Sequence, residues 1–364
     1  MEQSAAGYGQ PLNVPEIHQF LDHVLGIDHN DPVHRDLIRP VCIWGRAGIG
    51  KTQLVRDYAE QKGMAFGYVA PAQFEEMGDF HGMPVVSGDR MRYAVPQWVP
   101  QDTGQPGILL LDDFNRSDER ILKGLMQLFQ NHGLMSWSLP QHWHILCTAN
   151  PDQTDYAVTR LDEAMLTRLL HVTLRFDPKA WAEWALANRI DSRGIDFILT
   201  YPEMAEGRMT NPRSLSTFFR HTALIGDILG QQALVKAIAA SLLDTETVST
   251  FLSFVQEALQ HLPTTEEILL ATDFKSVEQR LYKLCVRPDT IRLDILGTVT
   301  TRLMMQIRLK PPAEPSVENL LRFLKLGFLP NDLRASMHRE IVAMARPAFN
   351  KILQDKKLAS LIVG

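Results

Sequence analysis

The sequence predicts an α/β domain built on a parallel sheet, followed by a long all-helical region. Three observations support this fold class. The first half contains short apolar runs without strict polar alternation, which is typical of strands buried on both faces. Segments with apolar residues at helical spacing lie between these runs, which favours a doubly wound sheet. After about residue 177, apolar residues recur at the spacing of a helix.

The first half is expected to alternate between strands and helices. Helices are predicted over 51–62 and 117–131, and Ser117 followed by Glu119 and Arg120 fits a helix start. Apolar runs of four to seven residues are the five predicted strands: 39–44, 65–70, 107–112, 143–149 and 170–176.

The second half is expected to consist of amphipathic helices. They are predicted over 178–188, 212–226, 230–243, 246–260, 277–286, 289–309, 316–326, 330–345 and 347–358, with a Pro-rich break at 311–315. Together these patterns divide the chain into an N-terminal helical segment (1–36), an α/β core (37–177), a helical lid (178–263) and a C-terminal helical domain (264–364).

Composition and charge limit the compartment and the partners. The net charge is −5, with 37 Lys and Arg against 42 Asp and Glu, so no overall basic field attracts nucleic acid. The charge is uneven, because residues 264–364 contain 16 basic and 11 acidic side chains. Three scattered cysteines make no disulfide framework, and no apolar run is long enough to span a bilayer. We therefore expect a cytoplasmic protein without membrane insertion.

A phosphate-binding loop is predicted between the first apolar run and the first helix. Residues 45–52 read GRAGIGKT, which matches the pattern G-x-x-x-x-G-K-[ST] in its required strand–loop–helix context. Glycines let backbone N–H groups turn toward phosphate oxygens, the lysine reaches the β and γ phosphates, and the threonine hydroxyl binds Mg²⁺. The predicted nucleotide-binding residues are Gly45, Ala47, Gly48, Ile49, Gly50, Lys51 and Thr52.

A second acidic motif follows the third apolar run, where residues 108–116 read ILLLDDFNR. A buried strand ending in carboxylates places Asp112 as a second Mg²⁺ ligand beside Thr52. Asp113 then lies where a carboxylate polarises the attacking water. ATP and Mg²⁺ are the expected substrate and metal, although no motif distinguishes ATP from GTP.

The order of these motifs resembles that of AAA+ ATPases. GRAGIGKT is followed by LLLDDFNR, CTANP (147–151), DEAMLTRLL (162–170) and NPRS (211–214). The pair Asn115-Arg116, the segment 79–84 and the segment 96–100 are similar, more narrowly, to the MoxR branch and its helix-2 insertion. This resemblance covers roughly residues 37–225 and implies a parallel sheet of five strands in the order 5-1-4-3-2.

The resemblance implies roles for three further polar residues. Asn150 matches the sensor 1 residue, which orients the attacking water from a strand between those that carry Lys51 and Asp112. Arg168 matches the arginine finger that acts on a neighbouring subunit's nucleotide, with Arg160 as an alternative. Arg213 matches sensor 2 on the helical lid.

One residue departs from the family pattern. The usual catalytic residue is Glu, whereas this chain has Asp113, which is shorter by one methylene or about 1.5 Å. A base misplaced by about 1 Å costs on the order of a hundredfold in rate. We therefore expect ATP hydrolysis that is slow, unless a shifted backbone restores the reach of the carboxylate.

The resemblance also implies a biological role. MoxR-type ATPases form hexameric rings and remodel, activate or insert metal cofactors into a protein client, often with a von Willebrand factor A-type domain. This chaperone-like role is the first hypothesis. A nucleic-acid loader or motor and a slowly hydrolysing nucleotide switch are the alternatives. The basic segment 264–364 is expected to serve assembly or partner docking.

Overall fold

The computed structural model describes residues 8–27, 34, 37–151, 158–256, 262–288, 290–309 and 314–363. The chain forms two compact units, unit 1 (Met1–Ala180) and unit 2 (Trp181–Gly364). The finer division into four segments stays a prediction. The described residues leave out the end of the predicted helix 246–260, after residue 256. They also leave out the part of the Pro-rich break before residue 314.

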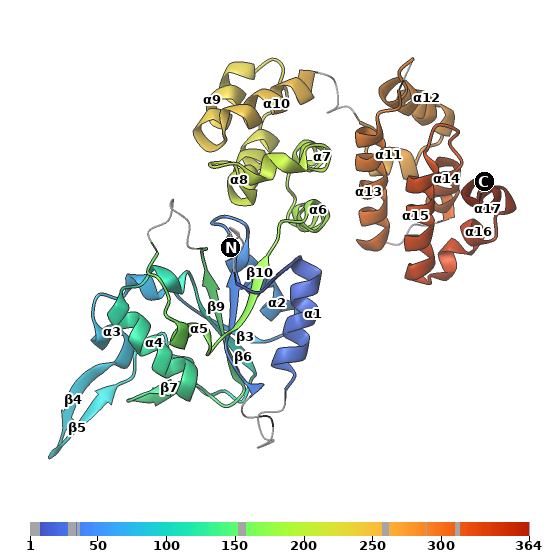
Figure 1. Cartoon of the computed structure of the whole chain (residues 1–364). Coiled ribbons are helices and arrows are strands. Elements are labelled where there is room, and N and C mark those ends of the chain that lie inside the picture. Colours follow the sequence, from blue (N-terminus) through green and yellow to red (C-terminus); the bar gives the residue numbers. More distant parts are fainter. Residues whose placement is uncertain are drawn as a thin grey trace. The chain divides into compact units, whose positions relative to one another are not determined.

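Unit 1 is built on a parallel sheet of six strands (Figure 1). All five predicted strands form, and their order across the sheet is 5-1-4-3-2. The predicted count of five was wrong, because a strand of three residues adds a sixth position beside β10, too short to give a periodic pattern. In spatial order the strands are β1 (Gln10–Leu12), β10 (Leu170–Leu174), β2 (Val41–Trp44), β9 (Trp143–Ala149), β6 (Gly107–Leu111) and β3 (Ala65–Val69).

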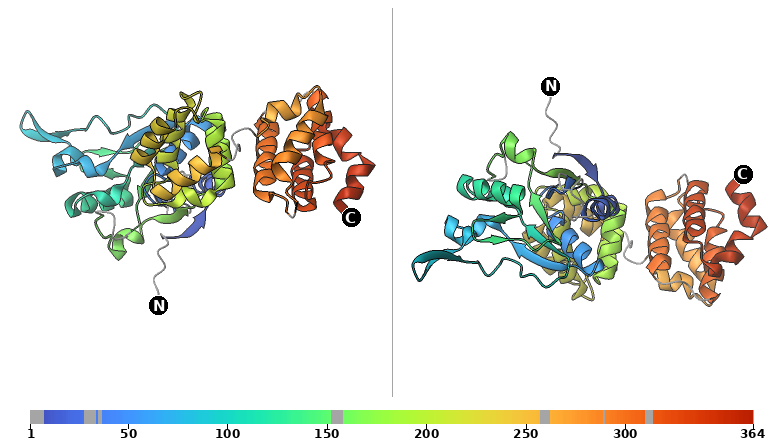
Figure 2. Two further views of the ribbon diagram at one scale, coloured as in Figure 1. Left: turned by 90° about the horizontal axis from the view of Figure 1, so that it is seen from above. Right: turned by 90° about the horizontal axis from the view of Figure 1, so that it is seen from below.

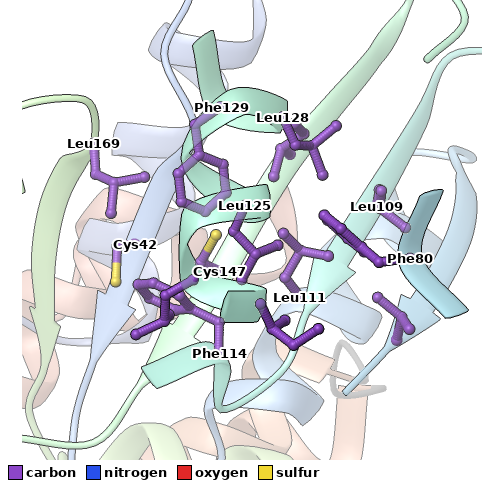
Figure 3. Packing of buried hydrophobic residues seen from close by; sticks show 14 of the residues in the cluster. Cys42, Phe80, Leu109, Leu111, Phe114, Leu125, Leu128, Phe129, Cys147 and Leu169 are labelled. Carbon is purple, nitrogen blue, oxygen red and sulfur yellow. The ribbon is translucent and has the colours of Figure 1, made fainter. Parts of the chain in front are cut away.

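Helices cover both faces of this sheet, which explains why the strands are continuous apolar runs. Ile108 and Leu110 belong to the core on one face, whereas Leu109 and Leu111 belong to the core on the other. Figure 3 shows the second core, where side chains of α4 pack over Leu109, Leu111 and Cys147. The covering helices are α1 (Val14–Leu25) and α2 (Lys51–Gln61) on the first face, and α3 (Met77–His81) and α4 (Glu119–Asn131) on the second.

A β-hairpin interrupts the α/β pattern of unit 1 and was not predicted. It pairs β4 (Met83–Ser87) with β5 (Arg90–Ala94) in antiparallel register. Nearly all of its side chains are exposed, and it extends away from the sheet (Figure 2). The remaining short elements of unit 1 are β7 (Gly133–Leu134), β8 (Trp137–Ser138), α5 (Glu163–Leu166) and the 3₁₀ helices η2 (Pro71–Gln73) and η3 (Phe114–Arg116).

All helices and strands that the structure assigns within the described residues of unit 2 are helices, as predicted, and an isolated antiparallel bridge joins Val286 and Ile291. Its first part packs around five buried phenylalanines, Phe197, Phe218, Phe219, Phe251 and Phe254. The elements of this part are α6 (Pro178–Ala187), whose first three residues belong to unit 1, α7 (Ser192–Thr200), η4 (Pro202–Glu206), α8 (Pro212–Ala223), α9 (Gln232–Leu242) and α10 (Thr245–Gln256). The second part contains α11 (Thr265–Leu269), α12 (Phe274–Cys285), α13 (Leu293–Leu309), α14 (Glu314–Leu324), α15 (Asn331–Met344), η6 (Pro347–Phe349), α16 (Asn350–Leu353) and α17 (Lys356–Val363).

Several predicted helix limits were wrong, since α12 begins at Phe274 rather than at 277 and α13 begins at Leu293 rather than at 289. Asp118, not Ser117, is the N-cap residue of α4, which begins at Glu119, because the Asp118 carboxylate accepts hydrogen bonds from the backbone N–H groups of Arg120 and Ile121. The single helix predicted over 347–358 is instead η6, α16 and the first turn of α17. Asp355 interrupts it, because its carboxylate accepts from the Leu358 N–H and pairs with Lys325 at 2.6 Å.

Candidate functional site

The carboxyl ends of β2, β6 and β9 meet at one edge of the sheet, as parallel neighbours must. Residues 45–50 lead from the end of β2 to Lys51, the first residue of α2. Gly48 and Gly50 have φ angles of 78° and 108°, in the left-handed region that favours glycine. The predicted loop, which includes Gly45, Ala47 and Ile49, therefore has the strand–turn–helix form of a phosphate-binding loop.

Lys51 is the central cation of this edge, and its side chain is only 5% exposed. Its ammonium donates hydrogen bonds to the carbonyl of Gly45 at 2.9 Å and of Arg46 at 3.3 Å. It also donates to Oδ1 of Asn150 at 2.9 Å. A buried charge needs such partners to offset the loss of water. The structure therefore brings together the predicted lysine and the predicted sensor residue, which are 99 positions apart.

Asp112 and Thr52 lie side by side, as predicted for a pair of Mg²⁺ ligands. The Thr52 hydroxyl donates to Oδ1 of Asp112 at 2.7 Å, and the Thr148 hydroxyl donates to the same oxygen at 2.6 Å. Tyr68 donates from its hydroxyl to Oδ2 at 3.2 Å. Burial, and then the negative charge of Asp112, raise the pKa of Tyr68. This set of hard oxygen donors fits Mg²⁺, which is held in proteins by one or two carboxylates together with substrate phosphates.

Asp113 has an unusual backbone for a residue other than glycine. Its φ and ψ angles are 47° and 41°, in the left-handed helical region. Its N–H donates to the Thr148 hydroxyl at 2.7 Å. Its carboxylate lies 3.9 Å from the ammonium of Lys51 and 3.8 Å from the guanidinium of Arg116. The predicted base thus lies beside the predicted phosphate-binding lysine.

Asn150 is fixed by a second asparagine, Asn115. The Asn115 amide nitrogen donates to the carbonyl of Asn150 at 2.7 Å, and its amide oxygen accepts from the N–H of Asn150 at 3.1 Å. Both residues are almost fully buried, with 2% and 1% of their surfaces exposed. Because both backbone groups of Asn150 are held, its side chain has a defined position toward Lys51.

The two finger candidates lie in the segment of unit 1 between β9 and β10. Arg168 follows α5, is partly exposed, and donates to the carbonyl of Ala164 and to Oε1 of Gln130. Arg160 is exposed. Both are on unit 1, and the choice between them stays a prediction.

Arg213, the predicted sensor 2, lies on unit 2 in the first turn of α8. Its side chain is exposed, and Asn211 caps the helix by accepting from the N–H groups of Arg213 and Ser214. Pro212 occupies the first helical position, which suits its fixed φ angle. The predicted helix start is confirmed, and the role of Arg213 toward nucleotide stays a prediction.

Comparisons with known proteins add a distant structural similarity. No protein-family model matches this sequence, and no curated protein sequence matches it. A solved structure of a RuvB mutant from Thermotoga maritima is similar over 77% of this chain and 79% of that chain, with 13% sequence identity and a TM-score of 0.36. Among the residues described, none of the helices is both long and apolar enough to cross a membrane.

Three polar residues of the site were not assigned a role from the sequence. Thr148 belongs to the CTANP motif and Asn115 to the LLLDDFNR motif, but the order of the motifs does not say which groups these side chains contact. Tyr68 lies in a predicted strand as an exposed aromatic residue. A signal was available for Thr148, because it lies two residues before Asn150 and therefore on the same side of a strand that reaches the site.

Proposed function

We propose that this chain is an ATPase of the AAA+ type. The observation that carries the proposal is the convergence of groups that follow three separate strands, β2, β6 and β9. Lys51 lies 2.9 Å from Asn150 and 3.9 Å from Asp113, and Thr52 bonds to Asp112 beside them. A phosphate-binding loop, a metal-binding pair, a carboxylate base and a polar orienting group at one sheet edge are the parts that nucleotide hydrolysis requires.

Each residue then has a chemical task. Lys51 stabilises negative charge on the β and γ phosphates, and Thr52 and Asp112 hold Mg²⁺, which neutralises further phosphate charge. Asp113 accepts a proton from the attacking water, and Asn150 orients that water. The buried side chain of Lys51 and the fixed backbone of Asn150 support this proposal, because preorganised groups do not have to reorient during the reaction.

A ring of identical subunits would complete the site. Arg168 is proposed as the residue that stabilises transition-state charge on the nucleotide of a neighbouring subunit. Its partial exposure and its position at the end of a short helix support this role. Arg213 is proposed to respond to nucleotide from the helical lid. A hexamer is the stoichiometry that the motif resemblance implies.

The narrower proposal is a MoxR-type chaperone that remodels, activates or inserts a metal cofactor into a protein client in the cytoplasm. This proposal rests on the order of the motifs. It is supported by the exposed hairpin, whose register places Pro84, Val86, Met91 and Tyr93 on one face. Val86 is 85% exposed and Met91 is 62% exposed, which is unusual for apolar side chains without a partner.

The structure gives less support to a nucleic-acid role than the basic composition of residues 264–364 does. Three basic side chains of the C-terminal segment bind groups within unit 2. Arg334 is 3% exposed and donates to backbone carbonyls, and Arg346 donates to the carbonyls of Ile307 and Arg308. Lys351 pairs with Glu318 at 2.9 Å. These three side chains stabilise helix ends and helix contacts, so they contribute less to a basic surface than the sequence alone suggests.

A slowly hydrolysing switch remains the second candidate, and the observation that favours it is Asp113 itself. The test compares ATP hydrolysis alone, with duplex DNA, and with a von Willebrand factor A-domain protein encoded beside it, while light scattering follows assembly. We expect ATP-dependent hexamers and stimulation by the protein partner. Stimulation by DNA alone would contradict the chaperone proposal, and tight ATP binding without turnover would favour the switch.

A further inference from the structure

Thr148 is the one hydroxyl in the described site that contacts both acidic residues. It lies on β9, between β2 and β6, and is fully buried. Its oxygen lies 2.6 Å from Oδ1 of Asp112 and 2.7 Å from the backbone nitrogen of Asp113. A threonine hydroxyl has one proton to donate and lone pairs to accept. Here the proton goes to the Asp112 carboxylate, so the oxygen accepts the N–H of Asp113.

The second of these bonds, from the N–H of Asp113, involves a residue with a left-handed backbone. A left-handed backbone costs most residues other than glycine about 1 kcal/mol, and aspartate adopts it more readily than most. Such a conformation persists where the surroundings hold it. At Asp113 two hydrogen bonds do so, one from its N–H to Thr148 and one from the N–H of Arg116 to its own carbonyl. The turn directly after β6 is therefore defined by Thr148 from one side and by η3 from the other.

The turn decides where the short carboxylate lies. With this backbone, Oδ1 of Asp113 is 3.9 Å from the Lys51 ammonium, which itself bonds to Asn150. The side chain of an aspartate thus reaches the group that binds the phosphates. A glutamate on the same turn would carry its carboxylate about 1.5 Å farther from the backbone.

We propose that Thr148 is a positioning residue of the hydrolytic site, and that the turn it holds adapts the site to aspartate. Thr148 acts through Asp113, whose backbone it fixes, and through Asp112, whose carboxylate it orients. This inference rests on the proposed ATPase function. It gives a physical reason why the shorter residue at position 113 is compatible with turnover.

The test compares Thr148→Val, which keeps the shape and removes the hydroxyl, with Thr148→Ser, which keeps the hydroxyl. Losing a hydrogen bond to a charged group corresponds to a roughly tenfold to hundredfold loss of rate. We expect Thr148→Val to lower kcat by about that factor while KM and the Kd for ATP change less than about threefold. Thr148→Ser should keep kcat within about threefold of the wild type. If the role of Thr148 were purely structural, Thr148→Val would lower Tm without a selective loss of kcat relative to KM.

Asp113→Glu provides a second, independent arm that does not depend on the folding of Thr148→Val. We expect its kcat to fall, on the order of a hundredfold for a displacement of about 1 Å. A faster Asp113→Glu variant, or unchanged kcat in Thr148→Val, would overturn the role of Thr148 and leave the ATPase proposal standing. A wild-type chain that hydrolyses neither ATP nor GTP would overturn both.

Discussion

Replacing Asn115 by alanine should damage both stability and turnover. The substitution removes the amide that binds the N–H and the carbonyl of Asn150 at 3.1 Å and 2.7 Å. Both backbone groups are buried, and an unpaired buried polar group costs about 1–3 kcal/mol. We therefore expect the free energy of unfolding to fall by about 3 kcal/mol, a large part of the total for an ordinary domain.

The effect on turnover follows from the same contact. Once its backbone is released, Asn150 no longer holds its side chain toward Lys51, and a displacement of about 1 Å costs on the order of a hundredfold in kcat. Urea unfolding and steady-state ATP hydrolysis measure the two effects. Asn188→Ala is the matched control, because the Asn188 amide makes one exposed bond to a helix carbonyl. If Asn115→Ala changed the unfolding free energy by less than about 0.5 kcal/mol, as expected for a surface change, the reasoning would be refuted.

Three further substitutions test separate parts of the account. Arg168→Ala should lower turnover by about a thousandfold with ATP affinity nearly unchanged, and Arg160→Ala should not; the opposite result in an ATPase assay would assign the finger to Arg160. Burial raises the pKa of Asp196 to about 6, so the folded chain binds this proton more tightly than the unfolded chain and gains stability as pH falls. Urea unfolding of the wild type should show about 1 kcal/mol of this gain between pH 7.5 and pH 5, and Asp196→Asn should lose it; an equal gain in both would contradict the assignment. Arg334→Met should destabilise unit 2 by about 3 kcal/mol, since the guanidinium binds four carbonyls, without altering ATP binding; a loss of ATP affinity would contradict a purely structural role.

The strands and the phosphate-binding loop could be predicted because their signals are local. Each central strand is apolar on both faces, and both faces are covered by helices. The loop needs left-handed residues at Gly48 and Gly50, and glycine is what the sequence has there. The acidic pair follows a buried strand, so its position at the sheet edge follows from the strand itself.

The elements that were missed have weak or absent local signals. The hairpin mixes exposed apolar residues with arginines and has no buried face. Helix α7 contains Gly194, a poor helix residue that is explained only by packing, because a Cβ there would lie 2.3 Å from the Phe219 ring. Asp118 caps α4 where Ser117 also fitted the pattern, and both residue types favour the N-cap position.

Within the site, residue types could be predicted more readily than contacts. Lys51, Thr52, Asp112 and Asn150 belong to motifs whose chemistry is general. The bonds that Thr148 makes depend on the register between β9 and β6 and on the turn at Asp113. Such pairings join residues about 35 positions apart, and no periodicity records them.

The most direct test of the central claim measures nucleotide binding and turnover together, in the wild type and in Asp113→Asn. The amide keeps the size of the side chain but cannot accept the proton from water. We predict that the wild type binds and hydrolyses ATP in the presence of Mg²⁺. Asp113→Asn should bind ATP with a Kd within about threefold of the wild type and lose turnover by a hundredfold or more, on the order of the loss of a general base. Turnover that survives in Asp113→Asn would contradict the assigned base, and a wild type that binds no nucleotide would contradict the account as a whole.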